Sequence, residues 1–119
     1  MVSRKLAASA KTVSAFLNLM GNEKRLLIMN HLAGGELSVG VLAEKVQLSQ
    51  SALSQHLAKL RAFGLVDTRR EGQVIYYYCS SGAARDLLAT LDGFLTTGRP
   101  LAGPGPHYAA QRLRRVRMA

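Results

Sequence analysis

Two stretches with helical periodicity follow each other so closely that only a tight turn fits between them. Residues 39–46 form the first stretch, and residues 50 to about 63 form the second. Ser38 and Ser49 stand where helix N-caps are expected, because a serine hydroxyl can accept a hydrogen bond from the first turn. The three-residue link, residues 47–49, has helix-turn-helix spacing, although an ordinary helical hairpin in a small α domain has the same spacing.

The second of these helices has two contrasting faces. At about 100° per residue, Leu53, Leu57 and Leu60 fall within a sector of about 60° and predict a buried seam. No acid occurs between residues 50 and 62. The opposite face carries small, hydrogen-bonding or basic side chains: Ser51, Ser54, Gln55, Ala58, Lys59 and Ala62.

An outer face of this kind suits the major groove of duplex DNA. Small side chains let the backbone approach the bases, and glutamine can bind adenine through two hydrogen bonds. His56 lies at the edge of the buried seam, where packing is favoured over a DNA contact. Lys59 and Arg61 are expected to contact phosphates, which fix register without reading sequence. The candidate contacts to bases and to phosphates at the helix start are Ser49, Gln50, Ser51, Ser54 and Gln55.

A β-hairpin is predicted directly after this pair of helices. Residues 65–70 and 73–79 are rich in β-branched and aromatic side chains, and Glu71-Gly72 separates them. Arg69, Arg70 and Gln73 bracket the tip. The tip is either a solvent-exposed turn or, as favoured here, a wing whose arginines reach a minor groove or phosphates.

Three further helices complete the predicted fold, which is mainly α with a small β-hairpin (α+β) in the order α-α-α-α-β-β-α. The first helix has an apolar face from Leu6 to Met20. The second has a core stripe of Leu26, Leu27, Met29 or Asn30, and Leu32. The last helix follows the hairpin and ends near Gly98. Residues 1–98 are predicted to form one domain, followed by a Gly/Pro linker and basic tail at 99–119.

Several segments of this sequence together resemble the winged helix-turn-helix repressors of the ArsR/SmtB family, and within it the branch of nodulation and haemolysin regulators. The segments are residues 22–28, 36–43, 48–61, 64–66 and 74–77. The resemblance covers residues 8–97, and its long ungapped run at 48–61 makes it specific. It implies a homodimer, built on the first and last helices, that binds a palindromic operator in double-stranded DNA and usually represses transcription.

The residues themselves also suggest a dimer, because the first and last helices carry more apolar surface than a small domain needs. The alternative is that both stripes only close the core of the monomer. The candidate interface residues are Val13, Phe16, Leu17, Met20, Leu87, Leu88, Leu91, Phe94 and Leu95.

Charge and composition narrow the class of protein to which the chain can belong. The chain has 16 Lys and Arg against 7 Asp and Glu, a net charge of +9, and residues 99–119 hold five arginines and no acid. The tail is expected to be a disordered, salt-sensitive arm, with a docked arm as the alternative. No apolar run approaches the roughly 18–20 residues of a membrane span, and no secretory signal is expected, so a cytoplasmic protein without membrane contact is predicted.

No cofactor or metal is expected. In relatives that sense metals through cysteines, the matching positions here are Ser38 and Gly40, and the last helix offers Asp86 and Asp92 without histidine. Cys79 is the only cysteine, so a dithiol switch within one chain is excluded, and a buried structural role is favoured over a reactive thiol.

Three functions remain to be compared. The favoured one is a dimeric, sequence-specific transcriptional regulator. The second is a winged-helix protein-interaction module whose basic tail docks on an acidic partner. An enzyme is not expected, because no nucleophile–base pair, metal cluster or phosphate-binding glycine motif is present.

Overall fold

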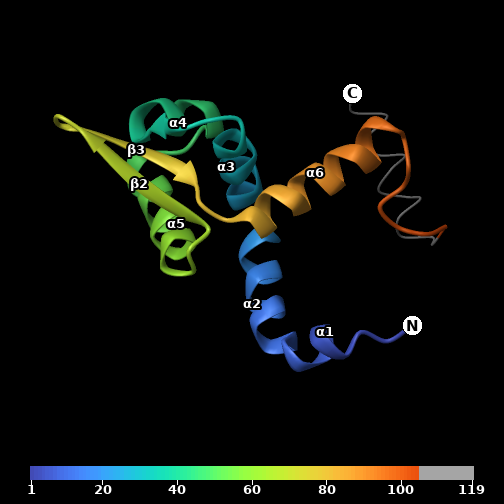
Figure 1. Ribbon diagram of the computed structural model, residues 1–119. Helices are drawn as coiled ribbons and strands as arrows, with labels where there is room; N and C mark the ends of the chain where they lie inside the picture. Colours follow the sequence, from blue (N-terminus) through green and yellow to red (C-terminus); the bar gives the residue numbers. More distant parts are fainter. Residues whose placement is uncertain (105–119) are drawn as a thin grey trace. The chain divides into compact units, whose positions relative to one another are not determined.

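The computed structural model describes residues 1–104 and shows six helices and three strands in that part of the chain (Figure 1). The helices are α1 (Arg4–Ala8), α2 (Ala10–Met20), α3 (Glu23–Ala33), α4 (Val39–Val46), α5 (Gln50–Ala62) and α6 (Gly82–Thr96). The strands are β1 (Leu37–Ser38), β2 (Val66–Glu71) and β3 (Val74–Cys79), paired antiparallel in the order β1-β3-β2. The predicted fold class is therefore confirmed.

Two details of the element order were not predicted. The first helix is divided at Ser9, whose φ of −104° and ψ of 12° depart from helical values. The strand β1 is also additional, and it pairs Leu37 with Tyr77 and Ser38 with Tyr76 of β3. A two-residue strand leaves no readable periodicity in a sequence, because alternation needs about four residues to become visible.

Capping side chains fix where three of the helices begin. The side chains of Asn22, Ser38 and Ser49 accept hydrogen bonds from the backbone N–H three residues further on, at 3.1, 3.4 and 3.1 Å. Each bond satisfies a first-turn donor that has no partner within its helix. The α4 helix ends at Gln47 in the left-handed region, at φ 56°. Capped helix starts and a left-handed stop together produce the short link between α4 and α5.

The core of the described part lies where α3, α4, α5 and the base of the hairpin meet. The predicted seam of α5, Leu53, Leu57 and Leu60, is buried. The other buried helix residues of this core are Ile28, Met29, Leu32, Leu42, Ala43 and Val46. Val66 and Cys79, which are register partners at the base of β2 and β3, are buried as well.

The predicted core stripe of α3 is partly wrong. Ile28 is fully buried, whereas Leu26 and Leu27, which were assigned to the core, are 36% and 38% exposed. Residues 26–29 are four consecutive apolar residues that surround most of the helix circumference, so periodicity alone does not define the buried face. Packing of α3 against α4 and β3 selects it instead.

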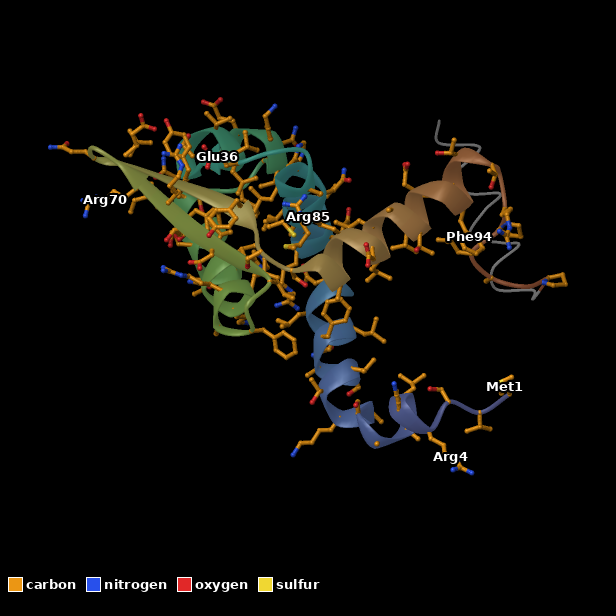
Figure 2. All side chains as sticks on the ribbon, in the orientation of Figure 1. Met1, Arg4, Glu36, Arg70, Arg85 and Phe94 are labelled. Atoms are coloured by element: carbon orange, nitrogen blue, oxygen red, sulfur yellow. The ribbon has the colours of Figure 1, made fainter. Side chains whose placement is uncertain are left out.

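Two long basic side chains join the elements that carry the hairpin and the helix pair. Lys24 Nζ donates to the carbonyl of Val46 at the end of α4, at 3.1 Å. Arg85, labelled in Figure 2, donates to the carbonyl of Ala33 at 3.1 Å and to that of Cys79 at 2.9 Å. Cations at helix C-termini interact favourably with the free carbonyls there. Lys24 thus connects the start of α3 to the end of α4, and Arg85 of α6 connects the end of α3 to the end of β3.

The chain divides into two compact units, Met1–Asp86 and Leu87–Ala119. The first contains α1 to α5, the sheet and the start of α6, and the second contains the rest of α6. The domain boundary predicted at residue 98 remains a prediction. Most of the predicted basic tail lies outside the described residues.

Candidate nucleic-acid interface

The start of α5 is arranged as an exposed, capped helix N-terminus. Ser49 uses its hydroxyl to accept the N–H of Ala52, and Ser49, Gln50 and Ser51 are all exposed. The first N–H groups of a helix and its dipole favour negative charge. This end of α5 is therefore suited to a phosphate group.

Beyond this end, α5 presents the outer face that its sequence predicts. Ser54, Gln55, Ala58 and Lys59 are exposed, while the apolar seam on the other side is buried. No acidic residue lies in the helix. The face combines small side chains, which allow close approach, with an amide that can both donate and accept hydrogen bonds. That combination can read base edges in a major groove.

His56 occupies an intermediate position between the buried seam and the exposed face. It is half-buried. Burial, and secondarily the charges of Arg25 and Lys59, lower the pKa of His56 below its ordinary value of 6.5. A neutral, partly packed imidazole accords with the packing role that the sequence favours.

Arg61, near the end of α5, lies beside the first part of the hairpin. Its Nε is 3.5 Å from a carboxylate oxygen of Asp67, and both side chains are about half exposed. An exposed ion pair of this kind is weak and is easily exchanged for another anion. Arg61 therefore remains a candidate phosphate contact.

The hairpin forms a wing whose tip is a two-residue link of Gly72 and Gln73. Gly72 has a φ of 61°, which glycine adopts without the steric cost that a side chain brings. Gln73 is exposed, and Arg70 is exposed with its Nε donating to the carbonyl of Gly72 at 3.2 Å. Both side chains lie at the tip, as the sequence predicts.

Arg69 has a different environment from its neighbour Arg70. Its Nε donates to Glu36 at 3.0 Å, its Nη2 donates to the other oxygen of Glu36, and its Nη1 donates to Glu71 at 2.9 Å. The guanidinium also lies 4.8 Å from the centre of the Tyr76 ring. Its hydrogen bond lowers the pKa of the Glu36 carboxyl, and the two glutamates raise the pKa of Arg69. Sequence reasoning missed Glu36 because 33 residues separate it from Arg69.

The predicted dimer residues of α2 differ in exposure. Leu17 is 49% exposed, and Val13 and Phe16 are half-buried. Met20 is only 3% exposed and therefore already packs in the core of the single chain, and its place in the interface stays a prediction. The difference follows from the helix end, where Met20 turns towards the core while the earlier turns extend beyond it. Val13 and Phe16 also line an open groove of about 330 Å³ that reaches Phe63 and Leu65.

The part of α6 in the second unit is also amphipathic. Leu95 is 65% exposed. Arg99 lies 4.2 Å from the centre of the Phe94 ring, an arrangement in which a cation is attracted to the ring face. The remaining predicted interface residues, Leu87, Leu88, Leu91 and Phe94, are half-buried.

The comparisons with known proteins agree with this geometry. Residues 22–68, which contain α3, β1, α4, α5 and the start of β2, match the family described as bacterial regulatory protein, arsR family. The nodulation protein NolR of Rhizobium meliloti is 56% identical over 82 residues, which are 69% of this chain and 67% of that protein. The chain belongs to the arsR family.

Two other comparisons cover a similar or larger share of this chain. The transcriptional activator HlyU of Vibrio cholerae is 51% identical over 83 residues, covering 70% of this chain and 76% of that protein. A homodimeric winged helix-turn-helix DNA-binding domain from Mycobacterium bovis is 27% identical, with a TM-score of 0.70. That match covers 87% of this chain and 96% of the other.

Positions associated with sensing in arsR-family relatives show no metal-binding arrangement in the described residues. Ser38 at one of these positions is occupied in capping α4. Within residues 1–104, no three His, Cys, Asp or Glu side chains are grouped in a way that could hold a metal ion. None of the helices there is long and apolar enough to cross a membrane. Cys79 is 3% exposed, and its thiol donates to the carbonyl of Ser81 at 3.5 Å.

Proposed function

We propose that this arsR-family chain is a cytoplasmic, homodimeric regulator of transcription that binds a palindromic operator in duplex DNA. The observation that carries the proposal is the exposed, acid-free face of α5, which begins at a capped N-terminus and stands beside a wing with an exposed arginine. A helix with these properties meets the requirements for direct readout in a major groove.

The contacts divide by chemistry. Gln50, Ser54 and Gln55 face the bases, because amides and hydroxyls form the hydrogen bonds that distinguish base pairs. Ser49 and Ser51 place the helix N-terminus on a phosphate, and Lys59 and Arg61 neutralise phosphates further along. Arg70 and Gln73 extend the contact from the tip of the wing. Arg69, although next in sequence to Arg70, has another role, which is treated below.

A dimer explains the apolar residues that the single chain leaves open on α2 and α6. Exposed leucines on an amphipathic helix are removed from water when a second copy covers them. Two-fold symmetry then presents two copies of α5 to successive major grooves, about 34 Å apart. The operator is accordingly a palindrome, and a dimer that occupies it near a promoter blocks transcription. Repression is the mode we propose.

Selection from a pool of random duplexes tests the proposal with the purified full chain. The expected result is enrichment of an inverted repeat whose half-sites lie about one helical turn apart, bound with a Kd on the order of 10⁻⁸ M or tighter at physiological salt. Genomic fragments recovered by the protein should contain the same repeat beside promoters.

The alternative function makes the opposite prediction for the same experiment. A winged-helix module that docks its basic tail on an acidic protein binds DNA only through charge. Its affinity would not depend on sequence and would fall steeply with salt. A selection that yields no preferred duplex would therefore contradict the proposed function.

A further inference from the structure

One face of the wing is organised around Arg69. In the antiparallel sheet, Arg69 of β2 is opposite Tyr76 of β3, and Tyr76 is opposite Ser38 of β1. Residues that are directly paired share a face of the sheet, and so do residues two apart on one strand. Glu71 therefore lies on the same face as Arg69. Glu36, which immediately precedes β1, is brought to this face by its contact with the Arg69 side chain.

The Arg69 side chain crosses the central strand. Because the strand order is β1-β3-β2, its own strand and β1 are not neighbours and lie about 10 Å apart at ordinary strand spacing. The guanidinium spans this gap above the Tyr76 ring, 4.8 Å from the ring centre, and reaches Glu36 on the far side. All three guanidinium nitrogens donate to carboxylates, two to Glu36 and one to Glu71.

The two faces of the wing differ in charge as a result. Asp67 and Glu71 share a face with Arg69, and Glu36 adds a third carboxylate there, so the three carboxylates outnumber the two arginines that pair with them, Arg69 and Arg61. Arg70, opposite Ile75, belongs to the other face. A DNA phosphate would be repelled by the carboxylates of the first face and attracted to Arg70 on the second.

We propose that Arg69 is a positioning residue rather than a DNA contact. Together with Glu36, Glu71 and Tyr76 it forms a clamp that sets the angle of the wing on the helix-turn-helix, and Arg70 makes the wing's contact with the DNA backbone. The inference rests on the proposed function, since it concerns how the same interface meets DNA.

The connection to the helix pair is short, which is why the clamp can transmit position. Glu36 is two residues from Ser38, and Ser38 caps α4, the first helix of the helix-turn-helix. A shift of the wing relative to Glu36 is therefore a shift relative to α4 and α5. Two parallel hydrogen bonds join Arg69 to one carboxylate within a network of several charges. Such a network fixes the positions of its side chains better than an isolated exposed ion pair does.

Charge-reversal variants distinguish a positioning role of Arg69 from a direct contact between Arg69 and DNA. The Arg69→Glu variant places carboxylates on both sides of the former clamp, and we expect its operator affinity to fall by about tenfold or more. Adding Glu36→Arg returns a guanidinium between two carboxylates and restores the native net charge. The double variant should bind the operator closer to the native protein than to Arg69→Glu. A double variant that binds as weakly as Arg69→Glu would show that Arg69 itself touches DNA.

A milder pair of variants gives an independent readout. Arg69→Gln and Arg70→Gln remove the same charge from adjacent residues on opposite faces. The slope of log K against log salt should decrease by about one for Arg70→Gln, which loses a phosphate contact, and should change little for Arg69→Gln. An equal decrease in both variants would overturn the clamp. Thermal melts of each variant establish that the fold is retained.

These results are distinguishable from failure of the proposed function. If the native protein selects no operator, the function is wrong whatever the variants do. If the native protein selects an operator and the double variant does not recover, only the clamp is wrong.

Discussion

At the scale of single residues, side-chain surroundings decide which charged groups are available to DNA. Arg69 and Arg70 are adjacent and equally charged, but strand alternation sends them to opposite faces. Among the described residues, Arg69 contacts two glutamates and an aromatic ring, whereas Arg70 donates a hydrogen bond to the carbonyl of Gly72. The charge counted from the sequence therefore differs from the charge that is available to contact DNA at the interface.

His56 provides a test at this scale through pH. Its pKa in the folded chain is below the ordinary value of 6.5, so the unfolded chain binds the proton more readily. Stability from this group is complete above pH 6.5 and decreases as pH falls through 6.5 towards the folded pKa. His56→Gln should therefore lose less free energy of unfolding between pH 7.5 and pH 5.5 than the native protein does. Urea denaturation at the two pH values measures the difference.

Lys59→Gln serves as a second variant for the same measurement. Removing one of the two cations that lower the pKa of His56 should make the pH dependence smaller than in the native protein, while burial keeps part of it. An identical pH dependence in the native protein and His56→Gln would contradict this account of the imidazole.

The individual residues were predictable to different degrees. The exposed face of α5 followed from periodicity, because polar and apolar residues alternate there at a clear helical spacing. The role of Arg69 did not follow, because its partner Glu36 precedes a strand too short to leave a pattern. Strand alternation alone could have placed Arg69 and Arg70 on different faces.

At the scale of elements, helix ends were easier to predict than helix faces. Asn22, Ser38 and Ser49 mark the starts of α3, α4 and α5, since a cap is a local hydrogen bond encoded by one residue. The face of α3 was misassigned, because it depends on packing against α4 and β3.

The open apolar face of α2 leads to a prediction about assembly. Leu17→Glu places a carboxylate on a face that we expect to be buried against a second copy, where an unpaired charge is strongly unfavourable. The variant should be monomeric in sedimentation at concentrations where the native chain is dimeric, and its operator affinity should fall at least tenfold.

Leu27→Glu is the matched control for this experiment. Leu27 is another exposed leucine, 38% exposed on α3, and lies outside the predicted interface. It should leave the dimer intact. If Leu17→Glu remained dimeric, the assignment of α2 to the interface would be wrong.

At the scale of the whole molecule, most of what could be predicted about the fold came from the order of the elements along the sequence. The close spacing of α4 and α5, followed at once by a hairpin, allows few packings in a short chain. Apart from β1 and the break at Ser9, that order was predictable because the longer elements have their own hydrophobic periodicity and end at residues typical of caps or turns. The division into units at Asp86 and Leu87 was not, since it runs through a continuous helix whose sequence shows no break.

The central claim is that α5 reads DNA sequence, and the ratio of operator to random-duplex affinity tests it most directly. Gln55→Ala should reduce this discrimination by roughly 1–3 kcal/mol for each lost base contact. Lys59→Ala, one turn further along the same face, should weaken binding to both duplexes alike and leave the ratio unchanged. A Gln55→Ala protein that retains the native ratio would contradict the account.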